Sequence, residues 1–284
     1  MDGIIIINKP KNCTSHDIVR KAKKAFNEKV GHTGTLDPNA TGVLPLLVGK
    51  GTQIAKYIIN HDKIYEATLK LGEKTDTADV EGVVIETKYI PKESLQIEIV
   101  NKVLQSFIGK QEQIPPIYSA IKVNGKKLYD YARKGEKVEI QPRQIEIYNM
   151  ELIKIDEQNK TVEFRVHCSK GTYIRTLCEN IAEKLGTVGY MKELNRTKVG
   201  EFSIDDSITI EDLQNGNYNN FITVEDYFKN YKNINLNEKK LQLFLNGVQL
   251  TWNFEDGIYR VYCDNKFIGI GSIKNNLLKR DIIL

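Results

Sequence analysis

Residues 31–43 read Gly-His-Thr-Gly-Thr-Leu-Asp-Pro-Asn-Ala-Thr-Gly-Val and leave the backbone less choice than any other stretch of this chain. Glycine allows backbone angles that are closed to other residues, while Pro38 fixes its own φ and restricts Asp37 before it. The three glycines are Gly31, Gly34 and Gly42. The segment is incompatible with a regular helix or strand. It predicts either an ordinary turn or a loop that aims a side chain, with the Asp37 carboxylate and the His32 imidazole as candidates.

Length and composition indicate a globular protein. The 284 residues suffice for one large domain and a small one, and 40% apolar with 27% charged residues is typical of soluble chains. The apolar run Ile4–Ile7 is too short for a signal peptide or a membrane span, so we expect a cytoplasmic protein without membrane contact. The cysteines are scattered without metal-binding spacing, which predicts reduced, packed thiols and no bound metal. They are Cys13, Cys168, Cys178 and Cys263.

Basic residues gather in two places, although the net charge is only +4. One cluster comprises Lys9, Lys11, Arg20, Lys21, Lys23, Lys24 and Lys29. The other comprises Lys122, Lys126, Lys127, Arg133, Lys134 and Lys137. The same stretch of the chain, 113–138, also contains Tyr118, Tyr129 and Tyr131. Such clusters suit phosphate contacts, and interleaved aromatic residues suit nucleic acid. A solvated lysine-rich surface is the alternative for either cluster.

Local patterns predict helices and strands that do not alternate regularly, which indicates an α+β fold. We expect strands at 2–8, 63–71 and 162–168, where apolar residues alternate in the last two. We expect helices from Thr14 or Ser15 to Phe26, with Asp17 completing a capping box, and from Thr172 to Leu185. Asn124-Gly125 predicts a tight turn. Residues 212–220 are interpreted as a linker, followed by a small β module from 233 to 284.

Several segments resemble motifs of the TruB family of tRNA pseudouridine synthases, in the same order. Residues 31–45 resemble the family's GHTGxLDPxATGxLP loop, and 168–177, Cys-Ser-Lys-Gly-Thr-Tyr-Ile-Arg-Thr-Leu, resemble its SxGTYIRxL segment. Lys63-Ile64-Tyr65 and the 194–200 segment match two further motifs. Lys9-Pro10 followed by Thr14-Ser15 matches an N-terminal motif, in which Asn12 replaces the usual glycine and should keep its left-handed backbone.

The resemblance implies a fold. It places a pseudouridine synthase catalytic domain over residues 1–215, built on a curved mixed or antiparallel sheet with a cleft across its middle. A small C-terminal β domain, similar to a PUA domain, would cover 230–284. The motif content beyond Gly200 is low, so this second expectation rests on analogy of fold.

The resemblance also implies the chemistry of Asp37. Pseudouridine formation breaks the bond between ribose C1′ and uracil N1, turns the base, and joins C1′ to C5. No cofactor is expected, because no redox step or phosphate transfer occurs. Asp37 would attack C1′ or C6, or take a proton from C2′, and all three routes stay open. Arg175 would keep the Asp37 carboxylate ionised by binding it through its guanidinium. The alternative for Arg175 is a surface ion pair with Glu179, four residues later.

Further site residues follow from the same matches. Tyr65 would stack on the target uracil, although packing against Ala67 and Leu69 is the ordinary fate of such a tyrosine. Tyr173 would line the pocket as a late acid or base. His32 would fill the space that the extracted base leaves. We do not expect His32 to transfer a proton in the reaction. The remaining substrate-binding candidates are Lys9, Leu194 and Arg196.

The resemblance implies a stand-alone monomer that acts on the T stem-loop of tRNA at uridine 55, without an obligate protein partner. Two alternatives remain. One is an RNA-guided synthase of the archaeal and eukaryotic type, and the other is a non-catalytic RNA-binding protein that helps tRNA to fold. Asp76 and Asp79 lack the alternating ligands of a calcium loop and are interpreted as loop-shaping residues.

Overall fold

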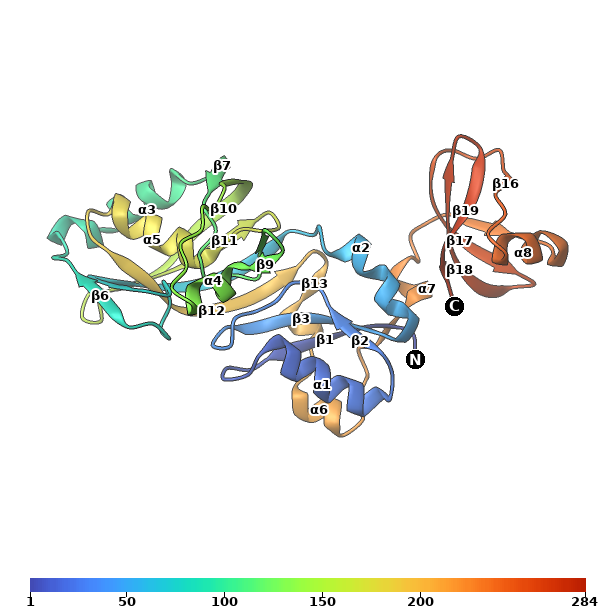
Figure 1. Ribbon diagram of the computed structural model, residues 1–284, viewed down its shortest axis with the longest axis horizontal. Helices are drawn as coiled ribbons and strands as arrows, with labels where there is room; N and C mark the ends of the chain where they lie inside the picture. The colour runs from blue at the N-terminus through green and yellow to red at the C-terminus, as the bar shows by residue number, and fades with distance from the viewer.

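The computed structural model describes residues 1–284 and shows an elongated α+β molecule with a large sheet and a smaller C-terminal sheet at one end (Figure 1). The large sheet is mixed, because β3 and β12 run parallel while its other neighbours are antiparallel. In spatial order its strands are β14 (Ile222–Thr223), β1 (Gly3–Lys9), β3 (Thr41–Val48), β12 (Gly189–Val199), β4 (Lys63–Leu71), β11 (Thr161–Cys168), β10 (Arg143–Asp156) and β7 (Gly109–Gln113), with β2 (Val30–His32) beside β3 and β13 (Phe202–Ser203) beside β12. The expected fold class is confirmed.

Strand β1 is buried on both faces, which explains its run of four isoleucines. Successive side chains of a strand point to opposite faces. Ile5 and Ile7 enter the main core, whereas Ile4 and Ile6 enter a second core on the other face. Strand β4 has the predicted alternation, and its inward residues all lie in the main core. These are Tyr65, Ala67, Leu69 and Leu71.

Helices cover the main core on one side of the sheet. Helix α1 (Ser15–Phe26) begins at Thr14, whose side chain and that of Asp17 form the predicted capping box, and ends at left-handed Asn27. Helices α3 (Ile97–Gln105) and α5 (Ile174–Lys184) cover the other half of the sheet (Figure 1). A 3₁₀ turn (Gly49–Ile54) leads into α2 (Ala55–Ile58), and another (Lys92–Leu95) precedes α3.

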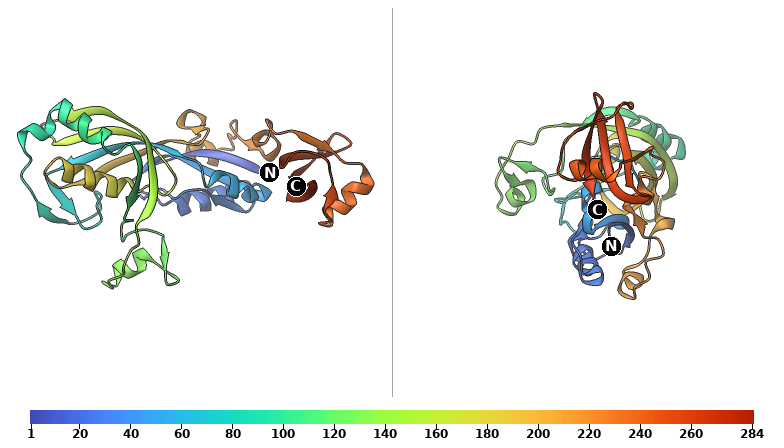
Figure 2. Two further views of the ribbon diagram at one scale, coloured as in Figure 1. Left: turned by 90° about the horizontal axis from the view of Figure 1, so that it is seen from above. Right: turned by 90° about the vertical axis from the view of Figure 1, so that its right-hand side faces the viewer.

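Two hairpins extend from this body. Strands β5 (Glu73–Thr75) and β6 (Val84–Thr87) form one. Strands β8 (Lys122–Val123) and β9 (Lys126–Lys127) form the other, with Asn124 and Gly125 at positive φ in the predicted turn. Helix α4 (Leu128–Arg133) follows, and this β8–β9–α4 excursion projects from the body (Figure 2). The second basic cluster thus lies on a protruding element.

The predicted linker at 212–220 is wrong, because this stretch packs against α1 beside the large sheet. Helix α6 (Ile210–Gln214) starts at a Thr209–Asp212 capping box and lies beside α1. Tyr218 packs on Phe26 with ring centroids 4.6 Å apart. Asn219 and Asn220 lie between Tyr218 and Phe221, and both of these aromatic residues pack on Phe26. A capping box in the sequence was the signal for the helix.

The C-terminal sheet confirms the expected β module. Its order is β15 (Asn233–Asn235), β17 (Gly257–Cys263), β18 (Lys266–Lys274), β19 (Leu277–Ile283) and β16 (Leu250–Thr251), with α8 (Glu238–Leu245) alongside. It shares the second core with the large sheet, since Ile270 and Ile282 pack in the same cluster as Ile4 and Ile6. Helix α7 (Val224–Tyr227) lies at this junction, and Asp281 accepts from Lys56 and Tyr57. No helix has the length and apolar character needed to cross a membrane.

Candidate active site

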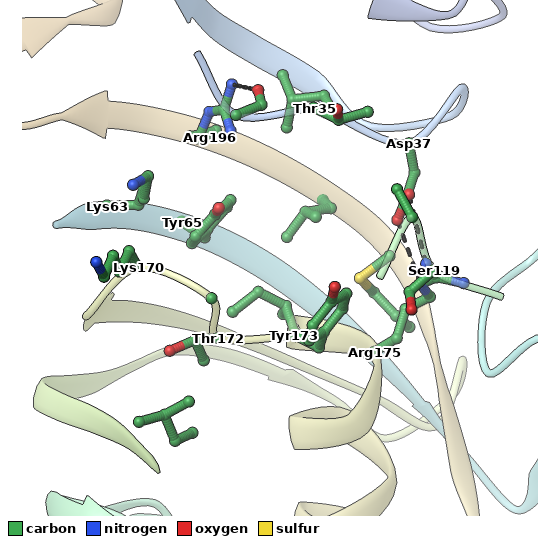
Figure 3. Close-up of a pocket in the computed structure, with 18 of the residues that line it drawn as sticks. Thr35, Asp37, Lys63, Tyr65, Ser119, Lys170, Thr172, Tyr173, Arg175 and Arg196 are labelled. Carbon is green, nitrogen blue, oxygen red and sulfur yellow. Dashed lines mark hydrogen bonds and ion pairs between the residues drawn. The ribbon is translucent and has the colours of Figure 1, made fainter. Parts of the chain in front are cut away.

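A pocket of about 700 Å³ opens where β4, β12, the β2–β3 loop and the start of α5 meet (Figure 3). Asp37 enters it from the loop, Tyr65 from β4, and Leu194 and Arg196 from β12. Tyr173 and Arg175 enter from the N-terminal end of α5. The fold thus brings together, at one pocket, six of the eight residues that the sequence singled out.

Three side chains hold the loop that presents Asp37. Lys9 is completely buried, and its Nζ donates to the carbonyls of Pro38 at 3.0 Å, Ala40 at 2.7 Å and Pro10 at 2.9 Å. The Leu36 amide donates to Ser15 Oγ at 2.9 Å, one residue before Asp37. Arg196 donates hydrogen bonds to carbonyls at the two ends of the loop. The Asp37 backbone is therefore fixed on both sides.

Arg196 is 1% exposed and joins the two ends of the loop. Its Nη2 donates to the Gly34 carbonyl at 2.9 Å and its Nε to the Val43 carbonyl at 2.8 Å. Gly42 lies against the same strand at φ +105°, where a Cβ would come within 2.2 Å of the Arg196 carbonyl. Position 34 also requires glycine, because its φ is +81°. Gly31 does not: it lies in β2 without positive φ and with room for a side chain.

The loop is therefore shorter than the sequence suggested. The expectation that residues 31–43 exclude regular structure is wrong at both ends, because 31–32 belong to β2 and 41–43 to β3. Only the stretch 33–40 is irregular, and a turn closes there with the Ala40 amide donating to the Asp37 carbonyl at 3.1 Å. The two alternatives predicted for this segment, an ordinary turn and a loop that orients a side chain, are therefore both present in the same loop.

Arg175 contacts the Asp37 carboxylate through two nitrogens. Its Nε lies 3.2 Å from Oδ2 and its Nη2 lies 3.4 Å from Oδ1. Arg175 is only 6% exposed, whereas the Asp37 side chain keeps 36% of its surface accessible from the pocket. The alternative pairing with Glu179 is wrong, because Glu179 contacts Lys74 at 3.3 Å.

A second carboxylate faces the same guanidinium. Asp79 Oδ2 lies 3.3 Å from Arg175 Nη1, and Asp79 is itself buried. Its other oxygen accepts from Thr77 Oγ1 at 2.6 Å and from the Glu81 amide at 3.1 Å. Asp76, in contrast, accepts from the Val83 amide at 2.8 Å and shapes the loop as expected. Asp79 therefore belongs to the site, in addition to shaping its loop.

Charges around Asp37 act on its pKa in opposite directions. Burial in the pocket raises the pKa of the Asp37 carboxyl above its ordinary value. The Arg175 guanidinium opposes this rise, the Asp79 carboxylate adds to it, and the Lys9 ammonium opposes it more weakly. Arg175 is thus the main group that favours the ionised form of Asp37, which is the form able to act as a nucleophile or base.

Aromatic rings form the walls beside the carboxylate. Tyr65 is buried apart from its pocket face, and burial raises the pKa of its phenol. Tyr173 precedes α5, where its backbone amide donates to Gln113 Oε1 at 2.8 Å and its carbonyl accepts from Gln113 Nε2 at 3.0 Å. Burial also raises the pKa of the Tyr173 phenol, so its hydroxyl stays protonated near neutral pH. Leu194 adds an apolar contact surface.

Two expected substrate contacts lie outside the pocket lining. Lys9 is buried beneath the loop with its ammonium bound to three carbonyls, and His32 lies in β2. The His32 Nδ1 is buried without a partner, and burial together with Arg196 and His16 lowers the pKa of the imidazole. The neutral imidazole is therefore the favoured form of His32. Its place beneath a substrate base stays a prediction.

Sequence reasoning missed Asp79 and the segment between β7 and β8. The Tyr118 carbonyl accepts from Arg175 Nη2 at 2.9 Å, and Ser119 lines the pocket next to it. A buried acid in a polar loop carries no local sign that distinguishes it from Asp76. The Pro115-Pro116 pair before Tyr118 was the available signal of an extended, specified segment.

Comparison with known families agrees with this geometry. Residues 21–174 match the model of the TruB family pseudouridylate synthase N-terminal domain, and 175–238 match that of the tRNA pseudouridylate synthase B C-terminal domain. Residues 233–279 match a further TruB C-terminal domain of pseudouridine synthase II. The family models thus cover both the pocket and the C-terminal sheet. This chain belongs to the TruB family of pseudouridylate synthases.

Curated relatives of this TruB-family chain are similar over nearly their whole length. The tRNA pseudouridine synthase B of Clostridium tetani is 48% identical over 279 residues, which is 95% of each chain. That of Clostridium kluyveri is 44% identical over 286 residues, covering 97% of this chain and 96% of its own. The structure also resembles the chain solved in a Cbf5-Nop10-Gar1 complex, with a TM-score of 0.68 at 23% identity over 99% of this chain and 83% of the other. This last similarity supports the fold.

Proposed function

We propose that this protein converts uridine 55 in the T loop of tRNA into pseudouridine, with the Asp37 carboxylate as nucleophile or base. The observation that carries the proposal is the Asp37–Arg175 pair, with contacts of 3.2 and 3.4 Å at the end of an aromatic-walled pocket. A carboxylate kept ionised within reach of a bound ribose is what the reaction requires. The names of relatives 44–48% identical over almost their full length support tRNA as substrate.

The pocket suits a nucleotide that has been turned out of its loop. Tyr65 offers a ring face for stacking on uracil, and Leu194 an apolar surface beside it. Lys63 and Lys170 line the end of the pocket away from Asp37 (Figure 3) and offer positive charge to flanking phosphates. The protruding β8–β9–α4 excursion supplies a further basic surface, on which Lys127 and Arg133 lie over the ring of Tyr129.

The test is direct. Purified protein is incubated with an unmodified T-arm stem-loop, and pseudouridine is mapped by carbodiimide adducts and primer extension. We expect conversion at uridine 55 and at no other uridine of the stem-loop, without added guide RNA or protein. Asp37→Asn should abolish product while leaving RNA binding largely intact, and Asp76→Asn serves as the matched control because Asp76 only shapes its loop.

The outcomes separate the alternatives. Product from the Asp37→Asn protein would refute the role of Asp37. Tight tRNA binding without product from the wild-type protein would favour the RNA-folding function. Conversion only with added guide RNA and partner proteins would favour the RNA-guided class; the similarity to Cbf5, at 23% identity, supports only the shared fold.

A further inference from the structure

Ser119 carries a buried hydroxyl without a partner in the protein. The residue is 5% exposed, lies between β7 and β8, and lines the pocket. Its Oγ is enclosed and makes no hydrogen bond to any protein group. Buried hydroxyls in native proteins nearly always have a partner, because an unpaired one loses its hydration without compensation. A hydroxyl of this kind facing a pocket indicates that a ligand supplies the partner.

The backbone around Ser119 is held by Tyr129 and, through the preceding residue, by Arg175. The Ser119 carbonyl accepts from the Tyr129 amide at 3.1 Å. The preceding carbonyl, that of Tyr118, accepts from Arg175 at 2.9 Å. Ser119 therefore lies one residue away from a contact of the guanidinium that also binds Asp37. Figure 3 shows Ser119 beside Arg175 and Asp37, with Tyr65 farther along the pocket.

Tyr173 is the neighbouring hydroxyl-bearing side chain. Burial raises the pKa of its phenol, and a weak polar interaction with the Ser119 hydroxyl opposes that rise in part. No hydrogen bond of regular geometry joins the two groups. The Ser119 hydroxyl is thus left available to a third group in the pocket.

The position of Ser119 selects which part of a nucleotide it meets, given the proposed function. All three routes left open for Asp37 place its carboxylate beside the glycosidic bond, at C1′, C2′ or C6. With Tyr65 stacked on the far part of the base, the ribose would lie at the Ser119 end of the pocket. We propose that Ser119 Oγ hydrogen-bonds the 2′-hydroxyl of the target ribose and makes the site prefer a ribonucleotide there. Both hydroxyls donate and accept, which lets them pair in either sense, and the 2′-hydroxyl is what distinguishes RNA from DNA at a site.

The experiment compares two T-arm stem-loops, one with uridine and one with 2′-deoxyuridine at the target position. For wild-type and Ser119→Ala proteins we measure kcat/KM on the uridine RNA and the inhibition constant of the deoxyuridine RNA against it. We expect Ser119→Ala to lower kcat/KM about tenfold and to leave the inhibition constant of the deoxyuridine RNA unchanged. Loss of the hydrogen bond weakens only the RNA that carries its partner.

A matched control separates this role from a structural one. Ser94 is equally buried, but its Oγ donates to the Leu185 carbonyl. Ser94→Ala should lower the thermal unfolding midpoint and leave the preference between the two RNAs intact, whereas Ser119→Ala should keep the midpoint. An equal loss on both RNAs, or none on the uridine RNA, would overturn the proposal for Ser119. Absence of conversion by the wild-type protein would instead overturn the proposed function.

Discussion

Arg175 and Asp37 lie 138 positions apart in the chain and meet through two nitrogen–oxygen contacts of 3.2 and 3.4 Å. The guanidinium is fixed from behind by the carbonyls of Tyr118 and Thr77, at 2.9 and 3.3 Å. It also faces Asp79 at 3.3 Å. One buried cation therefore joins the loop of Asp37, the loop of Asp79 and the segment that leads to the β8–β9–α4 excursion.

Removal of this cation should slow the chemical step. We expect Arg175→Met to lower kcat about a hundredfold or more, because it removes the main charge that favours ionised Asp37. KM should change far less, since the guanidinium is buried behind the carboxylate. Steady-state kinetics on the T-arm stem-loop checks this. Arg165→Met is the control, because Arg165 forms exposed pairs with Glu66 and Glu151.

The acidic limb of the pH–activity profile should respond to both neighbours of Asp37. Activity falls as the pH drops through the pKa of Asp37, since only the carboxylate reacts. Arg175 lowers this pKa and Asp79 raises it. Arg175→Met should therefore move the acidic limb to higher pH, whereas Asp79→Asn should move it to lower pH. Profiles of kcat/KM from acidic to neutral pH measure both shifts.

Asp79→Asn should also reduce kcat at neutral pH, because Arg175 loses one of the two carboxylates that orient it. The expected loss is about tenfold. Asp76→Asn should leave both kcat and the acidic limb unchanged. A shift in the same direction for Arg175→Met and Asp79→Asn would contradict the assignment of opposite effects on Asp37.

The sequence predicts those features of the site that depend on residues close together in the chain better than those that depend on contacts between distant segments. The alternation over 63–71 and the Thr14–Asp17 capping box are local, and both were confirmed. The pairing of Asp37 with Arg175 followed from the family resemblance, because local spacing favoured Glu179 as the partner. Asp76 and Asp79 look alike in sequence, and only tertiary packing places one of them against Arg175.

Lys9 gives a prediction about stability. Lys9→Met keeps an unbranched side chain but leaves two loop carbonyls, those of Pro38 and Ala40, and the Pro10 carbonyl without their donor. We expect the free energy of unfolding to fall by about 2–4 kcal/mol, measured by urea denaturation, with a loss of activity as the Asp37 loop loosens. Lys11→Met is the control: Lys11 is exposed and pairs with exposed Glu193, which is worth at most about 1 kcal/mol. Equal effects of the two variants would refute this role of Lys9.

Asp281 tests the junction with the C-terminal sheet. Its carboxylate accepts from Lys56 and Tyr57, and the Asp281 side chain is largely covered. Asp281→Ala should lower the free energy of unfolding by about 1–3 kcal/mol, because the Tyr57 hydroxyl is left half-buried without its acceptor. Glu255→Ala removes an exposed pair with Lys232, in loops next to the same sheet, and should change the free energy of unfolding little. Urea denaturation of both variants provides the comparison.

The apolar cluster that contains Ile4 and Ile6 together with Ile270 and Ile282 has a mechanical consequence. A domain joined only by a flexible linker could rotate freely. The C-terminal sheet cannot rotate relative to the large sheet without exposing their shared apolar core to water. The distance from the Asp37 carboxylate to the outer edge of the C-terminal sheet is consequently fixed once the chain has folded. Under the proposed function, an RNA that contacts both the pocket and the C-terminal sheet has to fit this fixed separation.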